Sequence, residues 1–182
     1  IEARKQVGDI FVGVPSGFKN IDRNMFGFEP STYTIIMARP SIGKTALALN
    51  ICYNVACLKK GKVLFFSLES NDRAIVRRML SCRSAIPLSN IRNGNIENSQ
   101  WPDIIEAAND LSTDYFAVLD RARFKSIENL CSMAETIALE SEVSLIIIDH
   151  LQKLRSTSSR FTSRHHEVSF ISDRISSLAK DL

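Results

Sequence analysis

The stretch ARPSIGKT, residues 38–45, combines residue types and spacing that suit the binding of phosphate groups. An apolar run precedes it and an amphipathic stretch follows, which is the strand, loop and helix order of a phosphate-binding loop. Main-chain N–H groups of such a loop and of the first helical turn point into one concavity, where the helix dipole adds partial positive charge. The residues expected to line the phosphates are Ala38, Arg39, Pro40, Ser41, Ile42, Gly43, Lys44 and Thr45.

Three of these residues have separate chemical roles. Gly43 lets the backbone approach the phosphates because it has no Cβ. Lys44 supplies a positive charge to the β and γ phosphates of a triphosphate, and the Thr45 hydroxyl suits a Mg²⁺ ligand. The usual pattern begins with glycine where this chain has Ala38, a mild departure because that position lies at the strand exit. The alternative is a chance match in an ordinary strand, turn and helix.

Two acidic residues could turn binding into hydrolysis, which needs one group to anchor the metal shell and another to activate water. Asp149 ends the apolar run LIIID, so it should emerge at the carboxyl edge of a strand, where ligands bind in open α/β sheets. Glu69 ends the run VLFFSLE and could align a water with the γ phosphate if its strand neighbours the phosphate loop. The plainer interpretations are a strand-terminating aspartate and a glutamate at the start of the next helix.

The elements that would position these groups alternate along the chain. Three apolar runs predict strands buried on both faces, at residues 32–38, 62–69 and 143–151, and residues 115–120 are a further candidate. Helical spacing covers residues 45–60 and 127–141, and residues 88–111 are turn-rich and then helical. This alternation predicts an α/β domain of three layers, with helices on both faces of a mostly parallel sheet.

Length and composition fit one domain, since 182 residues with 45% hydrophobic content can bury one core. No apolar run approaches the roughly 18 residues of a membrane span. The N-terminal IEARKQVGDI lacks the apolar core of a signal peptide, so we expect a cytoplasmic protein with no membrane partner. Four cysteines at irregular spacing indicate neither a disulfide framework nor a zinc site, and the net charge of +3 permits a polyanionic partner without requiring one.

Five stretches, in order, resemble one family: the C-terminal RecA-like motor domain of replicative hexameric DNA helicases of the DnaB type. They are GVPSGFKNID, ARPSIGKTALALN, FFSLE, LIIIDHLQKL and ISDRISSLAKDL. The resemblance covers nearly the whole chain and implies a RecA-like P-loop NTPase. We expect residues 1–8 to be the end of a linker segment and residues 9–182 to form the ATPase domain, truncated at its C-terminus.

By that resemblance, Lys44 and Thr45 bind the phosphates and magnesium of ATP, Glu69 activates water, and Asp149 holds the metal shell. The family couples ATP hydrolysis around a ring of six subunits to translocation on single-stranded DNA and unwinding of the duplex. The implied partners of the full-length protein are therefore single-stranded DNA, further copies in a hexamer, a primase and a loader.

A basic loop is the candidate DNA contact. Residues 152–166 contain no acidic residue and four cationic ones, Lys153, Arg155, Arg160 and Arg164. In RecA-like motors the loop after the magnesium-binding strand faces the channel, so these side chains could track phosphates. A solvated basic surface loop explains the same composition equally well.

The chain departs from the family pattern in two ways. It has His150 where the family usually has Tyr, and Lys153 where an apolar residue is usual, so we expect different packing beneath the loop. By the resemblance, the sensor strand and the arginine finger that completes a neighbour's site lie beyond Leu182. We therefore expect the 182 residues to be a fragment of a longer polypeptide.

Other ATPases and switches share these site residues. A RecA-like recombinase or a signalling ATPase would contain the same loop and carboxylates and differ only in the flanking stretches. A loader or scaffold that uses nucleotide as a switch would keep the fold without catalysis, which the presence of Glu69 and Asp149 disfavours.

The isolated chain should bind ATP with Mg²⁺ weakly and hydrolyse it slowly. An arginine finger supplied by a neighbour contributes about a thousandfold or more to related phosphoryl transfers, and the resemblance places that residue outside this sequence. Steady-state phosphate release by the purified 182-residue chain checks this expectation. Sustained turnover at the rate of a complete ATPase would contradict it.

Overall fold

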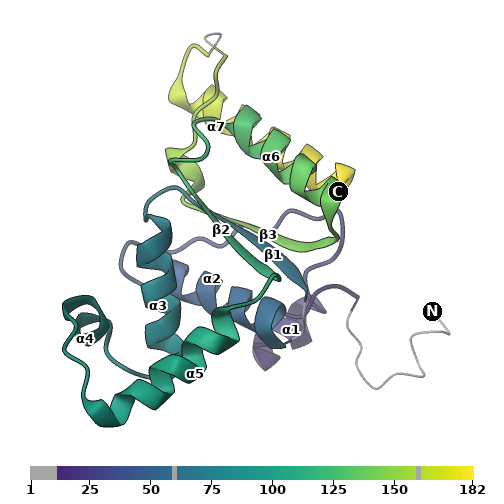
Figure 1. The fold of residues 1–182 in the computed structure, drawn as a ribbon. Coiled ribbons are helices and arrows are strands. Elements are labelled where there is room, and N and C mark those ends of the chain that lie inside the picture. Colours follow the sequence, from purple (N-terminus) through teal and green to yellow (C-terminus); the bar gives the residue numbers. More distant parts are fainter. Residues whose placement is uncertain (1–11, 59–60, 159–160) are drawn as a thin grey trace, which may run out of the picture.

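The computed structural model describes residues 12–58, 61–158 and 161–182. Within these ranges the chain forms a three-stranded parallel sheet in the order β2-β1-β3 (Figure 1). The strands are β1 (Lys62–Ser67), β2 (Phe116–Asp120) and β3 (Val143–Asp149). Ser67 at the end of β1 pairs with Asp120 on one side and Asp149 on the other, so all three strands end at one edge.

Helices cover both faces of the sheet, which gives the expected three layers (Figure 1). On one face lie α6 (Ile127–Glu140) and α7 (Arg164–Asp181). The other helices lie on the opposite side of the sheet: α1 (Lys19–Met25), α2 (Lys44–Tyr53), α3 (Asp72–Ser84), α4 (Leu88–Asn93) and α5 (Trp101–Leu111). Short helical turns occupy Asn54–Leu58, a π-helix that continues α2, and the 3-10 segments Asn98–Gln100 and Leu151–Lys153.

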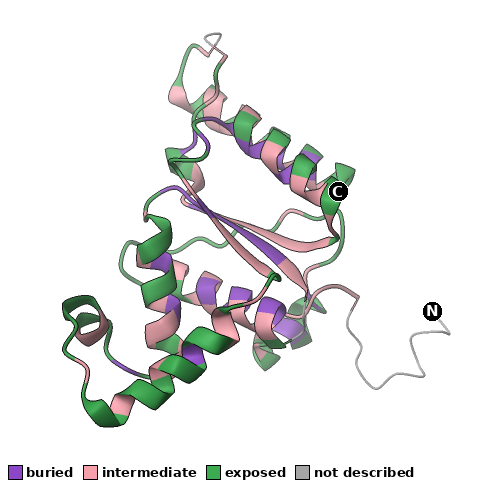
Figure 2. Ribbon diagram, in the orientation of Figure 1, coloured by how far each residue is buried: buried purple, intermediate pink, exposed green. Residues whose placement is uncertain are grey.

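The core is built around β1, whose side chains alternate between the two layers because successive residues of a strand point to opposite faces. Leu64 and Phe66 pack into a cluster with residues of α6 and α7. Val63 and Phe65 pack into a second cluster with residues of α2 and α3. All four side chains are fully buried, and Figure 2 shows β1 as the most continuously buried strand. The central strand therefore joins the two halves of the core.

Three of the four predicted strands are confirmed, although their burial is not as expected. β1 is buried along its length, whereas β2 and β3 each contain a single buried residue, Leu119 and Asp149. The physical reason is position: β2 and β3 are the two edges of the described sheet, so one side of each strand lacks a neighbour. Apolar composition predicted that these segments are strands, but it did not distinguish the centre of the sheet from its edges.

The prediction of a strand at residues 32–38 is wrong for this structure. No strand is assigned there, and the segment forms no backbone ladder with any of the three described strands. Its apolar side chains are exposed, with Ile35 at 60% and Met37 at 86% of full accessibility. An apolar, β-branched composition favours a strand, but a strand also needs a neighbour that accepts and donates its hydrogen bonds.

The helical predictions are largely confirmed. Residues 127–141 correspond to α6, and residues 88–111 form turns followed by α5. The helix expected at 45–60 begins one residue earlier and changes to a π-helical turn after Tyr53, and residues 59–60 lie outside the described ranges. Among the described residues, no helix combines the length and apolar character needed to cross a membrane.

Substituting Phe66→Ala should destabilise the fold by about 3–5 kcal/mol, because it opens a cavity in the β1 core and removes an aromatic pair. The Phe66 ring is fully buried and meets the Phe124 ring edge to face at a centroid distance of 5.3 Å. Urea unfolding measures the loss. Leu139→Ala is the control, since Leu139 is 89% exposed and should change stability by less than about 0.5 kcal/mol. Equal effects of the two substitutions would contradict the assigned core.

Candidate active site

The phosphate-binding stretch forms a tight turn that leads directly into α2. The Ile42 N–H approaches the Arg39 carbonyl at 3.4 Å, and Ser41 and Gly43 adopt left-handed backbone conformations with φ of 64° and 108°. Gly43 is the N-cap residue of α2, and its carbonyl accepts the first helical hydrogen bond from Leu47 at 2.9 Å. Side chains with a Cβ rarely adopt the backbone conformation of Gly43, which is one reason for glycine here. Nothing lies within 4 Å of the place a Cβ would occupy, so the concavity is open.

The start of α2 is joined to the end of β3 by one hydrogen bond. The Thr45 hydroxyl donates to Oδ2 of Asp149 at 2.8 Å, across a separation of 104 residues in sequence. Asp149 is the last residue of β3 and is 8% exposed. The two residues expected to hold the metal therefore lie side by side, and Lys44 is the neighbour of Thr45 in the first turn of α2.

Glu69 lies at the same edge of the sheet. It follows β1 by two residues, and the Leu68 N–H donates to the Asp149 carbonyl at 3.2 Å, which holds this segment against the end of β3. Helix α3 begins only at Asp72, with the Asn71 side chain accepting from Ala74 as its cap, so Glu69 is not part of that helix. It belongs instead to the loop between the strand and the helix.

Two nitrogen-bearing side chains contact the Glu69 carboxylate. His150 Nε2 lies 2.6 Å from Oε2, and the Lys153 ammonium lies 3.1 Å from Oε1. The same His150 nitrogen lies 3.8 Å from Oδ1 of Asp149, so this imidazole stands beside both carboxylates. His150 adopts a left-handed backbone conformation with φ of 73°, which ends β3 and turns the chain back towards Glu69.

These contacts fix the charge state of Glu69. The hydrogen bond from Lys153 lowers the pKa of the Glu69 carboxyl below its usual value, and partial desolvation opposes this only in part. His150 and Arg78 lower the pKa further. The carboxylate is therefore ionised at neutral pH, as a base that accepts a proton from water must be.

The oxygen ligands at this edge suit Mg²⁺ held mainly by a nucleotide. Mg²⁺ usually binds one or two protein oxygens, substrate phosphates and several waters. Thr45 and Asp149 supply one hydroxyl and one carboxylate in mutual contact. Among the described residues no group of three or more His, Cys, Asp or Glu side chains could hold a metal without a nucleotide. The residues present thus fit a magnesium ion that arrives with a triphosphate.

The basic loop beyond β3 is held by two acidic residues from outside it. Glu167 of α7 accepts from Arg155 at 2.9 Å, from Arg164 at 2.6 Å and from the Ser156 N–H at 3.0 Å. Glu128 of α6 accepts from the Ser156 hydroxyl and, at 3.1 Å, from the Thr157 N–H. Arg164 also donates to the carbonyls of residues 152 and 154. The arginines expected to contact DNA therefore make internal contacts, and Arg160 lies outside the described residues.

Sequence reasoning missed the contacts of four residues near the site. It noted His150 only as a departure from a family pattern, Lys153 as a departure and a candidate DNA contact, and Glu128 and Glu167 not at all. The available signal for the first two was their position within four residues after Asp149, at the edge where the strands end. No local signal existed for Glu128, because it lies on α6 and holds a loop from another part of the chain. For Glu167 the local signal was its i,i+3 spacing from Arg164 at the start of α7.

Comparison with known proteins identifies the family. The family described as DnaB-like helicase C-terminal domain matches residues 13–182. The chain belongs to this family. Replicative DNA helicase DnaC of Bacillus subtilis (strain 168) is 35% identical over 175 residues, which cover 96% of this chain and 38% of the relative. Replicative DNA helicase DnaB of Geobacillus stearothermophilus is 35% identical over 170 residues, which cover 93% of this chain and 37% of that helicase.

A solved structure gives the same result for the fold. The structure of a DnaB-like replicative helicase with its primase interactions is similar with a TM-score of 0.89 and 26% identity, covering 99% of this chain and 44% of that chain. The chain thus has the RecA-like fold of DnaB-like helicase domains, and membership of the family implies nucleotide binding. It spans less than two fifths of the length of the two curated relatives.

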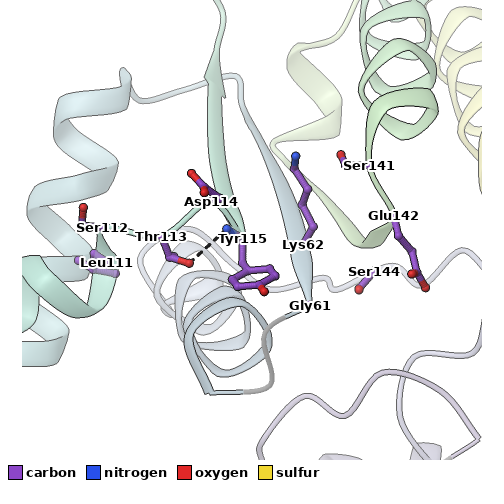
Figure 3. Close-up of a pocket in the computed structure, with 10 residues that line it drawn as sticks. All are labelled: Gly61, Lys62, Leu111, Ser112, Thr113, Asp114, Tyr115, Ser141, Glu142 and Ser144. Atoms are coloured by element: carbon purple, nitrogen blue, oxygen red, sulfur yellow. Dashed lines mark hydrogen bonds between the residues drawn. The ribbon is translucent and has the colours of Figure 1, made fainter.

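The pocket drawn in Figure 3 lies at the other end of the sheet of this DnaB-like domain. Its lining includes Lys62 at the start of β1 and Tyr115 and Glu142 just before β2 and β3. Glu69 and Asp149 follow or end the strands instead, and ligands of open α/β sheets bind at the carboxyl ends of strands. The pocket of Figure 3 is therefore separate from the candidate active site.

The two carboxylates that hold the basic loop, Glu128 and Glu167, predict how the stability of the fold depends on pH. Hydrogen bonds from the Ser156 N–H and Arg164 lower the pKa of Glu167 from 4.5 to about 2. For Glu128, burial alone would raise the pKa, but the hydrogen bonds from Ser156 and the backbone outweigh it and bring the pKa to about 2. A pKa that is lower in the folded state stabilises the fold above about pH 4.5, and this contribution is lost as the pH falls towards 2.

Glu167→Gln should therefore flatten the acid side of the stability curve. Urea unfolding between pH 6 and the acid limit, about pH 2–3, measures the free energy of unfolding at each pH. Glu140→Gln is the matched control, because Glu140 is exposed at the end of α6. An unchanged slope in Glu167→Gln would show that this carboxylate does not hold the loop.

Proposed function

We propose that this chain is the ATP-hydrolysing motor domain of a replicative DNA helicase. The observation that carries the proposal is the contact between Thr45 and Asp149, which joins the phosphate-binding loop to the end of β3. Glu69 lies at the same edge, within reach of the same imidazole as Asp149. These positions support the proposal of a phosphate cradle, a metal-holding pair and a carboxylate base at one corner of the sheet, which is the set of groups that phosphoryl transfer to water requires.

Each residue has a defined task in this reaction. The N–H groups of residues 38–45 other than Pro40, together with the Lys44 ammonium, would bind the phosphates of ATP, and Thr45 with Asp149 would hold the Mg²⁺ that accompanies it. When bound, Mg²⁺ supplies neutralising charge to the β and γ oxygens. Glu69 takes a proton from water as the water oxygen bonds to the γ phosphorus. The bond from that phosphorus to the β,γ-bridging oxygen breaks, and ADP leaves with the electron pair.

The partners of the full-length protein follow from its family. The relatives are named as replicative DNA helicases, and one solved relative is described with its primase interactions. We propose that the full-length protein binds single-stranded DNA, assembles as a hexamer, and meets a primase and a loader. Lys153, Arg155, Arg160 and Arg164 remain the proposed DNA contacts, although three of them make ion pairs with acidic side chains in this structure.

A recombinase or a signalling ATPase could use the same corner of the sheet. The family match over residues 13–182 favours the helicase, because it includes the flanking stretches as well as the shared loop. A strand-displacement assay on the full-length protein separates these functions. ATP-driven unwinding of a forked duplex supports the helicase, whereas filament formation on DNA without unwinding supports a recombinase.

Glu69→Gln in the full-length protein tests the assigned chemistry. The substitution keeps the shape of the side chain but removes the base, so the DNA-stimulated ATPase rate should fall by about 100-fold to 10,000-fold while nucleotide still binds. Lys44→Ala should weaken binding itself, measured by titration with a fluorescent ATP analogue. Lys180→Met, on the exposed end of α7, is the control and should leave both quantities unchanged. A Glu69→Gln protein that hydrolyses ATP at the normal rate would overturn the assignment.

A further inference from the structure

We propose that Lys153 is a positioning residue that restrains the Glu69 carboxylate until single-stranded DNA draws Lys153 away. This inference rests on the proposed function and adds a coupling between its two parts, DNA binding and ATP hydrolysis. Lys153 belongs to the basic loop that is the proposed DNA contact, yet its ammonium lies 3.1 Å from Oε1 of the proposed base. One side chain thus touches the hydrolytic machinery and stands at the entrance of the DNA-binding loop.

Both oxygens of Glu69 are engaged in this structure. Oε1 faces Lys153, and Oε2 faces His150 at 2.6 Å. A carboxylate whose two oxygens are engaged by Lys153 and His150 is a poor proton acceptor, because accepting a proton from water would disrupt these contacts. The contacts in this structure therefore hold the proposed base in a less reactive state.

Lys153 is the more easily released of the two partners. Its side chain is 40% exposed and ends the short helical turn Leu151–Lys153, whereas the His150 side chain is 22% exposed and also stands beside Asp149. Exposed ion pairs are weak, so a competing anion can replace one of them. A DNA phosphate is such an anion, and lysine binds phosphate as a mobile point charge.

Release of Lys153 would free Oε1 of Glu69 towards the water. Hydrolysis would then be fast mainly when DNA occupies the loop, which avoids consumption of ATP by protein that is not on DNA. Residues 155–157, which follow Lys153 in the loop, are already held in place by Glu128 and Glu167. This arrangement supports the release of Lys153 by DNA that binds the loop. DNA that binds the loop therefore meets Lys153 beside a fixed backbone.

The test is the ATPase rate of full-length Lys153→Met measured without DNA. Methionine keeps most of the length of the side chain but removes its charge, so the DNA-independent kcat should rise by about twofold to fivefold, the range that an exposed ion pair supports. The KM for ATP should stay unchanged, and the ratio of DNA-stimulated to basal kcat should fall by the same factor. Lys153→Arg, which can keep the ion pair, should behave like the wild type.

Two measurements separate this inference from simpler outcomes. The thermal midpoint of Lys153→Met shows whether the substitution only disturbs folding, and Lys180→Met controls for the loss of one surface charge. A basal kcat that is unchanged or reduced in a folded Lys153→Met protein would overturn the restraint. If the wild-type protein shows no ATPase activity even with single-stranded DNA, the proposed function fails instead, and the two failures are thereby distinguished.

Discussion

The parallel alignment of β1 and β3 is the constraint on which the candidate site depends. Because Ser67 and Asp149 are paired at the ends of these strands, any polar residue that follows β1 closely must lie near the end of β3. Glu69 is brought to Asp149 in this way, and the Thr45 hydrogen bond then attaches the first turn of α2 to the same point. Three segments that are far apart in sequence thereby converge, and the contacts of Glu69 with His150 and Lys153 join the segments that follow β1 and β3. The fully buried side chains of β1 keep this geometry fixed between two helical layers.

For the basic loop, a count of its charged residues overestimates the positive electrostatic potential at its surface. Four cationic residues in a stretch without acids predict a strong positive potential, but two acidic side chains pair with the three cations that the structure describes. Glu69 pairs with Lys153, and Glu167 pairs with both Arg155 and Arg164. The positive electrostatic potential of the loop is therefore weaker than its composition implies. This potential can change, because the exposed ion pairs can exchange partners at little cost in free energy.

Much of the fold and of the site could be predicted from the sequence because the signals are local. The apolar runs that became β1 and β3 carry their terminal acids at the edge where parallel strands bind ligands, and the glycine at residue 43 suits a left-handed turn before a helix. The segment at residues 32–38 could not be assigned correctly, because strand pairing depends on a neighbour that composition does not reveal. The roles of Glu128 and Lys153 were hidden for the same reason. Each of these side chains acts on a partner chosen by tertiary packing.

The left-handed backbone of His150 has a consequence for how this position can vary. A residue with a Cβ loses about 1 kcal/mol in that conformation, which glycine would recover. The imidazole, however, is the one group in contact distance of both carboxylates among the described contacts of Glu69 and Asp149. Glycine at position 150 would relieve the cost of the left-handed backbone, whereas His150 supplies the contacts with Glu69 and Asp149. The presence of histidine therefore indicates that these contacts matter more at this position than a relaxed backbone.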